Sequence, residues 1–198
     1  TIIQASDLKN KLEGLNLKRK ETTVISLDVE AMYPSIKFNV VKKAVEYFAR
    51  NLSNEELDKI DTCLSMIKFG MSNTLISFQD KYFEYGGDCE ADRRGLTIGG
   101  YESAWLADLV ASFLLEKQKN MFENTSHYHG IYRDDGIVFF KGDWKDRDVQ
   151  NWLEVFQFKV NEICESEDIV FTCEIWSDQE KTEKEEKMDE NIFKKRIK

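Results

Sequence analysis

The sequence GIYRDDGIVFF, residues 130–140, decides the expected fold. Two runs rich in β-branched and aromatic residues flank the triplet Asp134-Asp135-Gly136. An Asp-Gly pair between two such runs is a strong signal for a β-hairpin turn. We therefore expect residues 128–141 to form two short strands that break at this triplet and present both carboxylates at the tip.

A third carboxylate, Asp28, ends a second predicted strand over residues 22–28, within SLDVEAMYPSI at 26–36. If this strand pairs with the hairpin, Asp28, Asp134 and Asp135 converge at one edge of the sheet. Such a cluster is costly without counter-charge. Two divalent cations about 3.5–4 Å apart would supply that charge and support phosphoryl transfer. Mg²⁺ suits the site best, because it favours carboxylate oxygens together with substrate phosphates. The alternative is that each aspartate merely ends a strand or forms a turn.

The remaining sequence predicts an α+β domain. Apolar residues recur at helical spacing over 39–52, and Ser53 with Glu56 forms a capping box that starts a second helix. Further helices are expected over residues 6–15, 102–119 and 146–165, a hairpin over 74–85 and a strand over 168–176. This order is not a strict β-α-β alternation, and it favours an antiparallel sheet with helices on one face.

The composition excludes several classes of protein. The 198 residues carry a net charge of −9, which excludes a strongly basic nucleic-acid module but not a local basic patch. No run of about 18 apolar residues exists, so no membrane helix is expected. The four cysteines form no CxxC pair, which favours reduced thiols and an intracellular location, with nucleus and cytoplasm both left open.

Three segments resemble the motifs of right-hand polymerases, in the order that family has. SLDVEAMYPSI is similar to motif A, GLTIGGYESAWLADL at 95–109 to motif B of reverse transcriptases, and IYRDDGIVFF to motif C with its YxDD hairpin. The flanks DLKNKLEGL and DIVFTCEIW resemble those of Penelope-like retroelement reverse transcriptases. The resemblance implies a palm domain over residues 1–176. The charged segment 177–198 is expected to be a flexible tail.

The resemblance also implies roles for individual residues. Asp28 would bind both metal ions, and the Val29 carbonyl would complete the shell of one. Asp134 would be the first metal-binding aspartate of YxDD, and Asp135 the second, less demanding carboxylate. Tyr33 stands where reverse transcriptases place the aromatic gate that blocks a ribose 2′-OH and selects dNTPs. The alternative for Tyr33 is a core aromatic.

Motif B supplies the remaining nucleotide-binding residues. Gly99 and Gly100 match the small residues that let the template base and nucleotide approach the backbone. Thr97-Ile98 replaces the usual Pro-Gln, and Ala104 stands where proline is usual. No residue matches the family's general-acid lysine.

Two other features have competing interpretations. Arg93 and Arg94 precede motif B and could contact phosphate, although a solvated loop is the more ordinary interpretation. His127 and His129 form an HxH pattern, which on a regular strand would place both rings on one face. No third ligand is evident, so this pair does not predict a metal site by itself.

The resemblance therefore predicts an RNA-directed DNA polymerase that adds dNTPs to a primer 3′-OH, with two Mg²⁺ ions (Mn²⁺ as a substitute). Its expected partners are an RNA or DNA template with primer, a dNTP and no membrane. Fingers and thumb are largely missing from this sequence, so segments elsewhere in a longer chain are further expected partners. The alternative is a palm kept as a non-catalytic scaffold or interaction domain. A family B DNA polymerase, suggested by YPSI at 33–36, does not fit YRDD.

Overall fold

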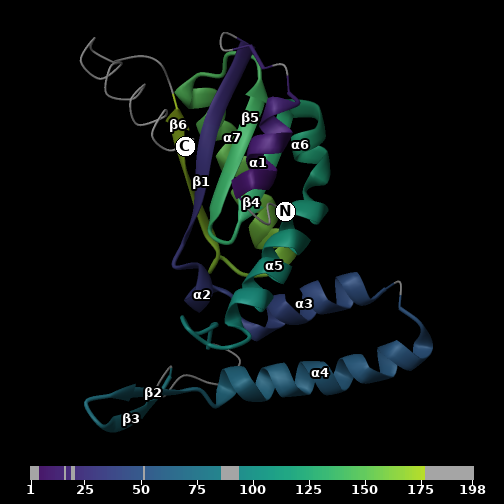
Figure 1. Ribbon diagram of the computed structural model, residues 1–198, viewed down its shortest axis with the longest axis vertical. Coiled ribbons are helices and arrows are strands. Elements are labelled where there is room, and N and C mark those ends of the chain that lie inside the picture. The colour runs from purple at the N-terminus through teal and green to yellow at the C-terminus, as the bar shows by residue number, and fades with distance from the viewer. Residues whose placement is uncertain (1–4, 16, 19–20, 51, 86–93, 177–198) are drawn as a thin grey trace.

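The computed structural model describes residues 5–15, 17–18, 21–50, 52–85 and 94–176. Its centre is a four-stranded antiparallel sheet in the order β4-β5-β1-β6 (Figure 1). The strands are β1 (Thr22–Glu30), β4 (Ser126–Tyr132), β5 (Asp135–Lys141) and β6 (Val170–Trp176). The expected pairing of the first strand with the 128–141 hairpin is confirmed, because β1 lies between β5 and β6.

Alternating burial along β1 shows why this segment forms a strand with one covered face. Ile25, Leu27 and Val29 are at most 5% exposed, whereas Asp28 and Glu30 are exposed on the opposite face. Three helices cover the buried face: α5 (Ser103–Lys117), α6 (Lys119–Thr125) and α7 (Asp146–Cys164). The sheet is therefore helix-covered on one face, as the sequence predicts, and the carboxylate of Asp28 lies on the other.

One helix lies on the opposite face, at the end of the sheet away from Asp28. In α1 (Ala5–Glu13), the Lys11 Nζ atom lies 5.8 Å from the centroid of the Tyr128 ring. That ring packs against Phe139, whose neighbour Phe140 faces the helix-covered core. Figure 1 accordingly shows α1 in front of β4 and β5, so the Asp28 end of this face stays clear of α1.

A second group of elements projects from the lower end of the sheet in Figure 1. It contains α2 (Met32–Ser35), α3 (Phe38–Ala49), α4 (Asn54–Ser72), β2 (Leu75–Phe78) and β3 (Lys81–Glu84). The predicted capping box is confirmed, because the Glu56 carboxylate accepts hydrogen bonds from the Ser53 N–H and hydroxyl at 2.9 and 2.7 Å. The predicted hairpin is also confirmed, with Gln79 and Asp80 at positive φ as a type I′ turn requires.

The predicted helix over 102–119 is interrupted. It ends at Lys117, and α6 begins two residues later, after Gln118. Gln118 is only 2% exposed, so the break between α5 and α6 lies inside the protein. None of the helices in the described part of the chain has the length and apolar composition that a membrane span needs.

Candidate active site

The turn of the β4–β5 hairpin lies earlier than the Asp-Gly pair predicts. Tyr132 pairs with Asp135, so Arg133 and Asp134 are the two turn residues. Arg133 has a φ of 58°, the left-handed value that the first position of a type II′ turn requires. Gly136 is instead a buried strand residue, and a Cβ atom there would lie 3.0 Å from Leu27 Cβ. Close packing against β1, not turn geometry, therefore explains the glycine.

The β1–β5 ladder ends close to two of the predicted carboxylates. Its last pair is Leu27 with Gly136, and the same antiparallel register continued by one position would set Asp28 opposite Asp135. Directly opposed residues project to the same face, with Cβ atoms about 4.5–5.5 Å apart. Asp134 is half-buried in the adjoining turn, and Thr172 of β6 pairs with Asp28 on its other side. The three predicted aspartates thus come from neighbouring backbone positions at one end of the open face.

This donor set suits a hard divalent cation by its chemistry. Asp28 and Asp135 are exposed, and both offer only oxygen ligands on a face that substrate could reach. Across the described ranges, no three Asp, Glu, His or Cys side chains already stand together as a metal-binding group. Holding an ion would therefore require these side chains to turn toward it, with further ligands from substrate and water.

The chain reverses direction directly after β1, which fixes the position of Tyr33. Ala31 has a φ of 44°, and the Ser35 hydroxyl donates to the carbonyls of Ala31 and Glu30 at 2.6 and 3.1 Å. The Tyr33 side chain is half-buried and packs partly against the core. The Val29 side chain is buried, which leaves its main-chain carbonyl as the group for the predicted role.

The start of motif B contacts the turn that follows β1 through main-chain atoms. The Leu96 N–H donates to the Ile36 carbonyl at 3.2 Å, and Gly95 forms a bridge with Lys37. A Cβ atom at Gly95 would lie only 2.0 Å from the Pro34 carbonyl oxygen. Only glycine allows this approach, so motifs A and B are joined through their main chains.

The two predicted motif B glycines have different surroundings. Gly99 has a φ of 86°, and a Cβ atom there would meet nothing within 4 Å. At Gly100, a Cβ atom would lie within 3.0 Å of the hydroxyl oxygens of Ser103 and Thr97, at 2.4 and 2.7 Å. Gly99 therefore faces open space before α5, as a backbone approached by a ligand would, whereas Gly100 packs inside the turn.

Sequence reasoning missed a pair of charges beside the hairpin tip. Asp108 of α5 is half-buried, and this burial raises the pKa of its carboxyl group, while the nearby Arg133 guanidinium opposes the rise. The Arg133 guanidinium also lies 5.4 Å from the centroid of the Tyr132 ring. The sequence could have pointed to Arg133, because it occupies the variable position x of the YxDD motif.

Arg94 is neither solvated nor available to phosphate, contrary to both interpretations of the sequence. Its side chain is 7% exposed and donates to the Ser72 carbonyl at 2.6 Å and to Glu84 Oε1 at 2.7 Å. It therefore fastens the β2–β3 hairpin to the end of α4 and to motif B. Arg93 lies outside the described residues, as does the tail 177–198.

The HxH pattern does not place two rings on one face. A bulge between Ser126 and Tyr128 breaks the alternation of β4, so His127 is exposed. The His129 ring stacks on Phe122 with centroids 4.2 Å apart, and its burial lowers the pKa of the imidazole. His129 is thus a half-buried residue that packs against the apolar core.

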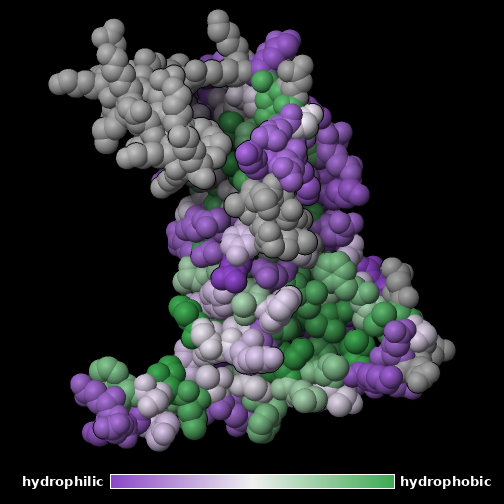
Figure 2. All heavy atoms as spheres, in the orientation of Figure 1, coloured by the Kyte–Doolittle hydropathy of each residue, from purple (hydrophilic) through white to green (hydrophobic). Residues whose placement is uncertain are grey.

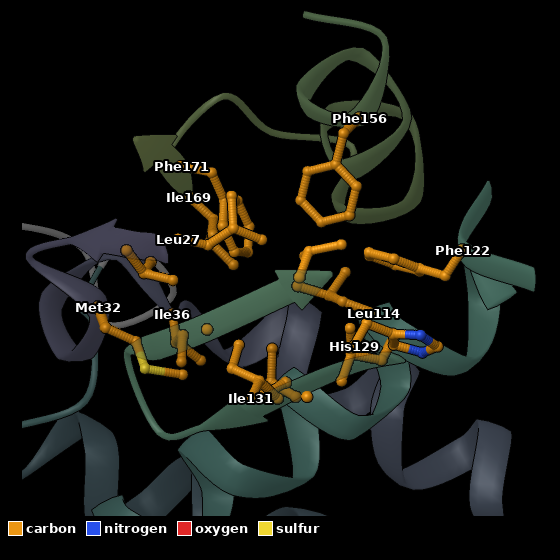
Figure 3. Close-up of a pocket in the computed structure, with 17 residues that line it drawn as sticks. Leu27, Met32, Ile36, Leu114, Phe122, His129, Ile131, Phe156, Ile169 and Phe171 are labelled. Carbon is orange, nitrogen blue, oxygen red and sulfur yellow. The ribbon is translucent and has the colours of Figure 1, made fainter. Parts of the chain in front are cut away.

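A small cavity of about 20 Å³ lies behind the open face (Figure 3). Leu27 and Phe171 reach it from the sheet, Leu114 from α5 and Phe156 from α7. It is large enough for about one water, but its almost wholly apolar lining offers few hydrogen-bond partners. It is therefore a packing gap beneath the strands, on the face away from Asp28.

Comparison with known proteins gives a likeness of structure alone. No protein-family model matches the sequence, and no curated protein matches it. A solved structure of telomerase from Candida albicans, in complex with a TWJ fragment of telomeric RNA, aligns over 92% of this chain with a TM-score of 0.58 and 13% identity. Apo telomerase from Candida tropicalis, truncated from the C-terminal domain, aligns over 91% with a TM-score of 0.51 and 10% identity.

The alignments cover 32% and 37% of those telomerase chains, so this chain spans about a third of their length. Because the sequence identities are only 10–13%, these structural alignments establish a similarity of fold and nothing more. Together with the antiparallel β4-β5-β1-β6 sheet and its helix-covered face, the alignments show that this chain has an α+β palm-like fold, similar to the aligned parts of these telomerase structures.

Proposed function

We propose that this chain is the catalytic palm of an RNA-directed DNA polymerase of the Penelope-like retroelement type. The observation that carries the proposal is the pairing of Leu27 with Gly136, because this register continued by one position would set Asp28 opposite Asp135. It supports two facing carboxylates beside Asp134, on the face of the sheet that α5, α6 and α7 leave uncovered. The motif order along the chain and the palm-like fold support the same function.

In this mechanism, Asp28 and Asp134 would hold two Mg²⁺ ions, and the Val29 carbonyl and Asp135 would be further ligands. When bound, the ions supply activation of the primer 3′-OH and stabilisation of the leaving oxygen. Mn²⁺ would serve in their place. The protein itself would orient the carboxylates toward the metal ions and hold the primer 3′-OH in line with the dNTP.

Substrate selection is assigned to residues around the turn that follows β1. The Tyr33 ring, held by its partial packing against the core, would exclude a ribose 2′-OH and favour dNTPs. The backbone at Gly99 and Gly100 would allow the template base and nucleotide to approach closely. The partners are a primed RNA or DNA template and a dNTP. The proposed setting is intracellular.

A second candidate function is a non-catalytic scaffold, and one observation favours it. α4 and the β2–β3 hairpin, which we call the α4–hairpin arm, project from the body and expose apolar side chains (Figures 1 and 2). Those at least 60% exposed are Met66, Phe69, Leu75, Phe78 and Tyr82. A two-stranded hairpin is marginally stable alone in water, so a protein partner would be expected to cover the arm.

Titration with Mn²⁺ separates the two functions. With dNTP and primer–template present, Asp134→Ala should weaken Mn²⁺ binding at least tenfold, since that carboxylate would be a direct ligand. Asp143→Ala is the matched control, because Asp143 is an exposed aspartate beyond the opposite end of β5. Identical titration curves for wild type and Asp134→Ala would contradict the catalytic proposal and favour the scaffold.

A further inference from the structure

The outer edge of β6 is a regular strand edge, unlike that of β4. β6 ends the strand order β4-β5-β1-β6, and all seven of its residues pair with β1 without a register shift (Figure 1). The other edge strand, β4, has a bulge between Ser126 and Tyr128. A bulge helps to keep an edge from pairing with another chain, whereas a regular edge can accept a further strand. β6 contains no proline and no bulge, and no described strand lies beyond it.

The side chain of Gln157 in α7 shows which main-chain groups of β6 point outward. Its Oε1 atom accepts a hydrogen bond from the Phe171 N–H at 2.8 Å, and its Nε2 atom donates to the Ile169 carbonyl at 2.8 Å. The side-chain amide thus takes the place of a neighbouring strand where β6 begins. The main-chain groups of alternate residues point to the same side of a strand. Those of Cys173 and Ile175 therefore also point outward, where no described strand pairs with them.

The sequence of β6 suits pairing with a second copy of itself. An antiparallel pairing that uses all seven residues must be centred on Cys173, the middle residue of the strand. It would set Glu174 of each copy opposite Thr172 of the other, so no like charges would face each other. At its ends it would set Trp176 opposite Val170, which are 66% and 37% exposed. Aromatic and β-branched residues are favourable cross-strand partners.

Shifted registers suit this edge less well. A pairing centred on Glu174 would place two carboxylates directly opposite each other, which is destabilising. A pairing centred on Thr172 would set Cys173 opposite Phe171, whose N–H is already bonded to α7. The register centred on Cys173 lets the two copies exchange the N–H and carbonyl groups of that residue. It also lets the Ile175 N–H donate to the free Phe171 carbonyl of the other copy.

We propose that two copies of this chain associate through their β6 edges, in an antiparallel pairing centred on Cys173. The two four-stranded sheets would then form one continuous sheet. The inference does not depend on the proposed polymerase function. An interface of one strand pair is small, so the dimer is weak and its fraction depends on protein concentration. A strand of a different protein is the competing occupant of this edge.

Disulfide trapping in the intact protein tests both the interface and its register. Thr172→Cys and Glu174→Cys are made separately, in a background in which Cys63, Cys89 and Cys173 are replaced by serine. In the proposed register, position 172 of one copy faces position 174 of the other with Cβ atoms about 4.5–5.5 Å apart, whereas identical positions lie diagonally at about 7–8 Å. Because a disulfide needs the shorter separation, a mixture of both variants should form linked dimers at least about tenfold faster than either variant alone.

Sedimentation velocity measures the strength of the same contact. For wild type, the dimer fraction should rise with protein concentration. Thr172→Glu should weaken the dimer about fivefold, because it sets like charges opposite each other at two symmetric positions, and Thr172→Lys should strengthen it. Ser77→Glu is the matched control, because it adds the same charge at an exposed position of β2 and should leave the dimer unchanged.

Two results would overturn the proposal. A wild-type protein that stays monomeric up to about 0.1 mM would leave the β6 edge to a strand of another protein. A dimer that forms, but in which the mixed cysteine variants link no faster than the separate ones, would exclude the β6 register. Such a dimer would point instead to the exposed apolar side chains of the α4–hairpin arm.

Discussion

Replacement of Gly95 by alanine should destabilise the protein strongly, because it separates motif B from motif A. The new Cβ atom would lie 2.0 Å from the Pro34 carbonyl oxygen and 2.4 Å from its carbonyl carbon. Relief of this overlap requires a movement of at least about 1 Å, since carbon atoms essentially never approach closer than 3.0 Å. Truncation of the Pro34 side chain cannot help, because the obstructing atoms belong to the main chain.

The cost can be estimated from what the movement disrupts. The hydrogen bond from Leu96 N to Ile36 O contributes about 1 kcal/mol. Overpacking costs about 1–3 kcal/mol, and Leu96, which is 1% exposed, would lose part of its burial. The expected total is about 3–4 kcal/mol. With a urea m-value of about 2 kcal/mol per molar, the unfolding midpoint should fall by roughly 1.5–2 M.

Urea unfolding followed by circular dichroism measures this cost directly. Gly99→Ala is the matched control, because its Cβ atom would meet nothing and only the φ of 86° opposes it. That substitution should cost about 1–2 kcal/mol. If Gly95→Ala proved no more destabilised than Gly99→Ala, the close contact between the two motifs would be refuted.

Two further predictions concern Tyr33 and His129. In primer extension by the intact protein, Tyr33→Ala should raise the incorporation of ribonucleotides relative to deoxyribonucleotides. Unchanged sugar discrimination would show that Tyr33 is a core aromatic and not a gate. Burial lowers the pKa of His129 below its ordinary 6.5, so the unfolded chain binds more protons and stability should fall as pH drops through this value. Urea unfolding from about pH 7.5 to 5.5 should show a weaker pH dependence in His129→Phe than in wild type, and equal slopes would contradict this assignment.

The elements of the sheet could be predicted because their patterns are local. Alternation along residues 22–28 and the paired β-rich runs at 128–141 each indicate a strand by themselves. The turn could not be placed, because the Asp-Gly signal competes with a long-range contact. Gly136 is needed in the strand, where β5 packs closely against Leu27. The turn is therefore formed by Arg133 and Asp134 instead of the Asp-Gly pair.

The candidate site divides in the same way. The motif pattern is enough to predict that the strand ending in Asp28 pairs with the hairpin that carries Asp134 and Asp135, because this pairing follows from the palm resemblance. Burial of Arg94 between Ser72 and Glu84 depends on three segments whose packing no local pattern encodes. The bulge that exposes His127 is likewise a feature of the ladder between β4 and β5.

Template-directed primer extension with Mg²⁺ and dNTPs, by the intact protein, tests the central claim most directly. Wild type and Asp143→Asn should extend a primed template. Asp28→Asn and Asp134→Asn should lose at least about a hundredfold in rate, because each removes a ligand whose ion stabilises charge in the transition state. Extension at wild-type rates by Asp28→Asn and Asp134→Asn would contradict the assignment of these aspartates as the catalytic site.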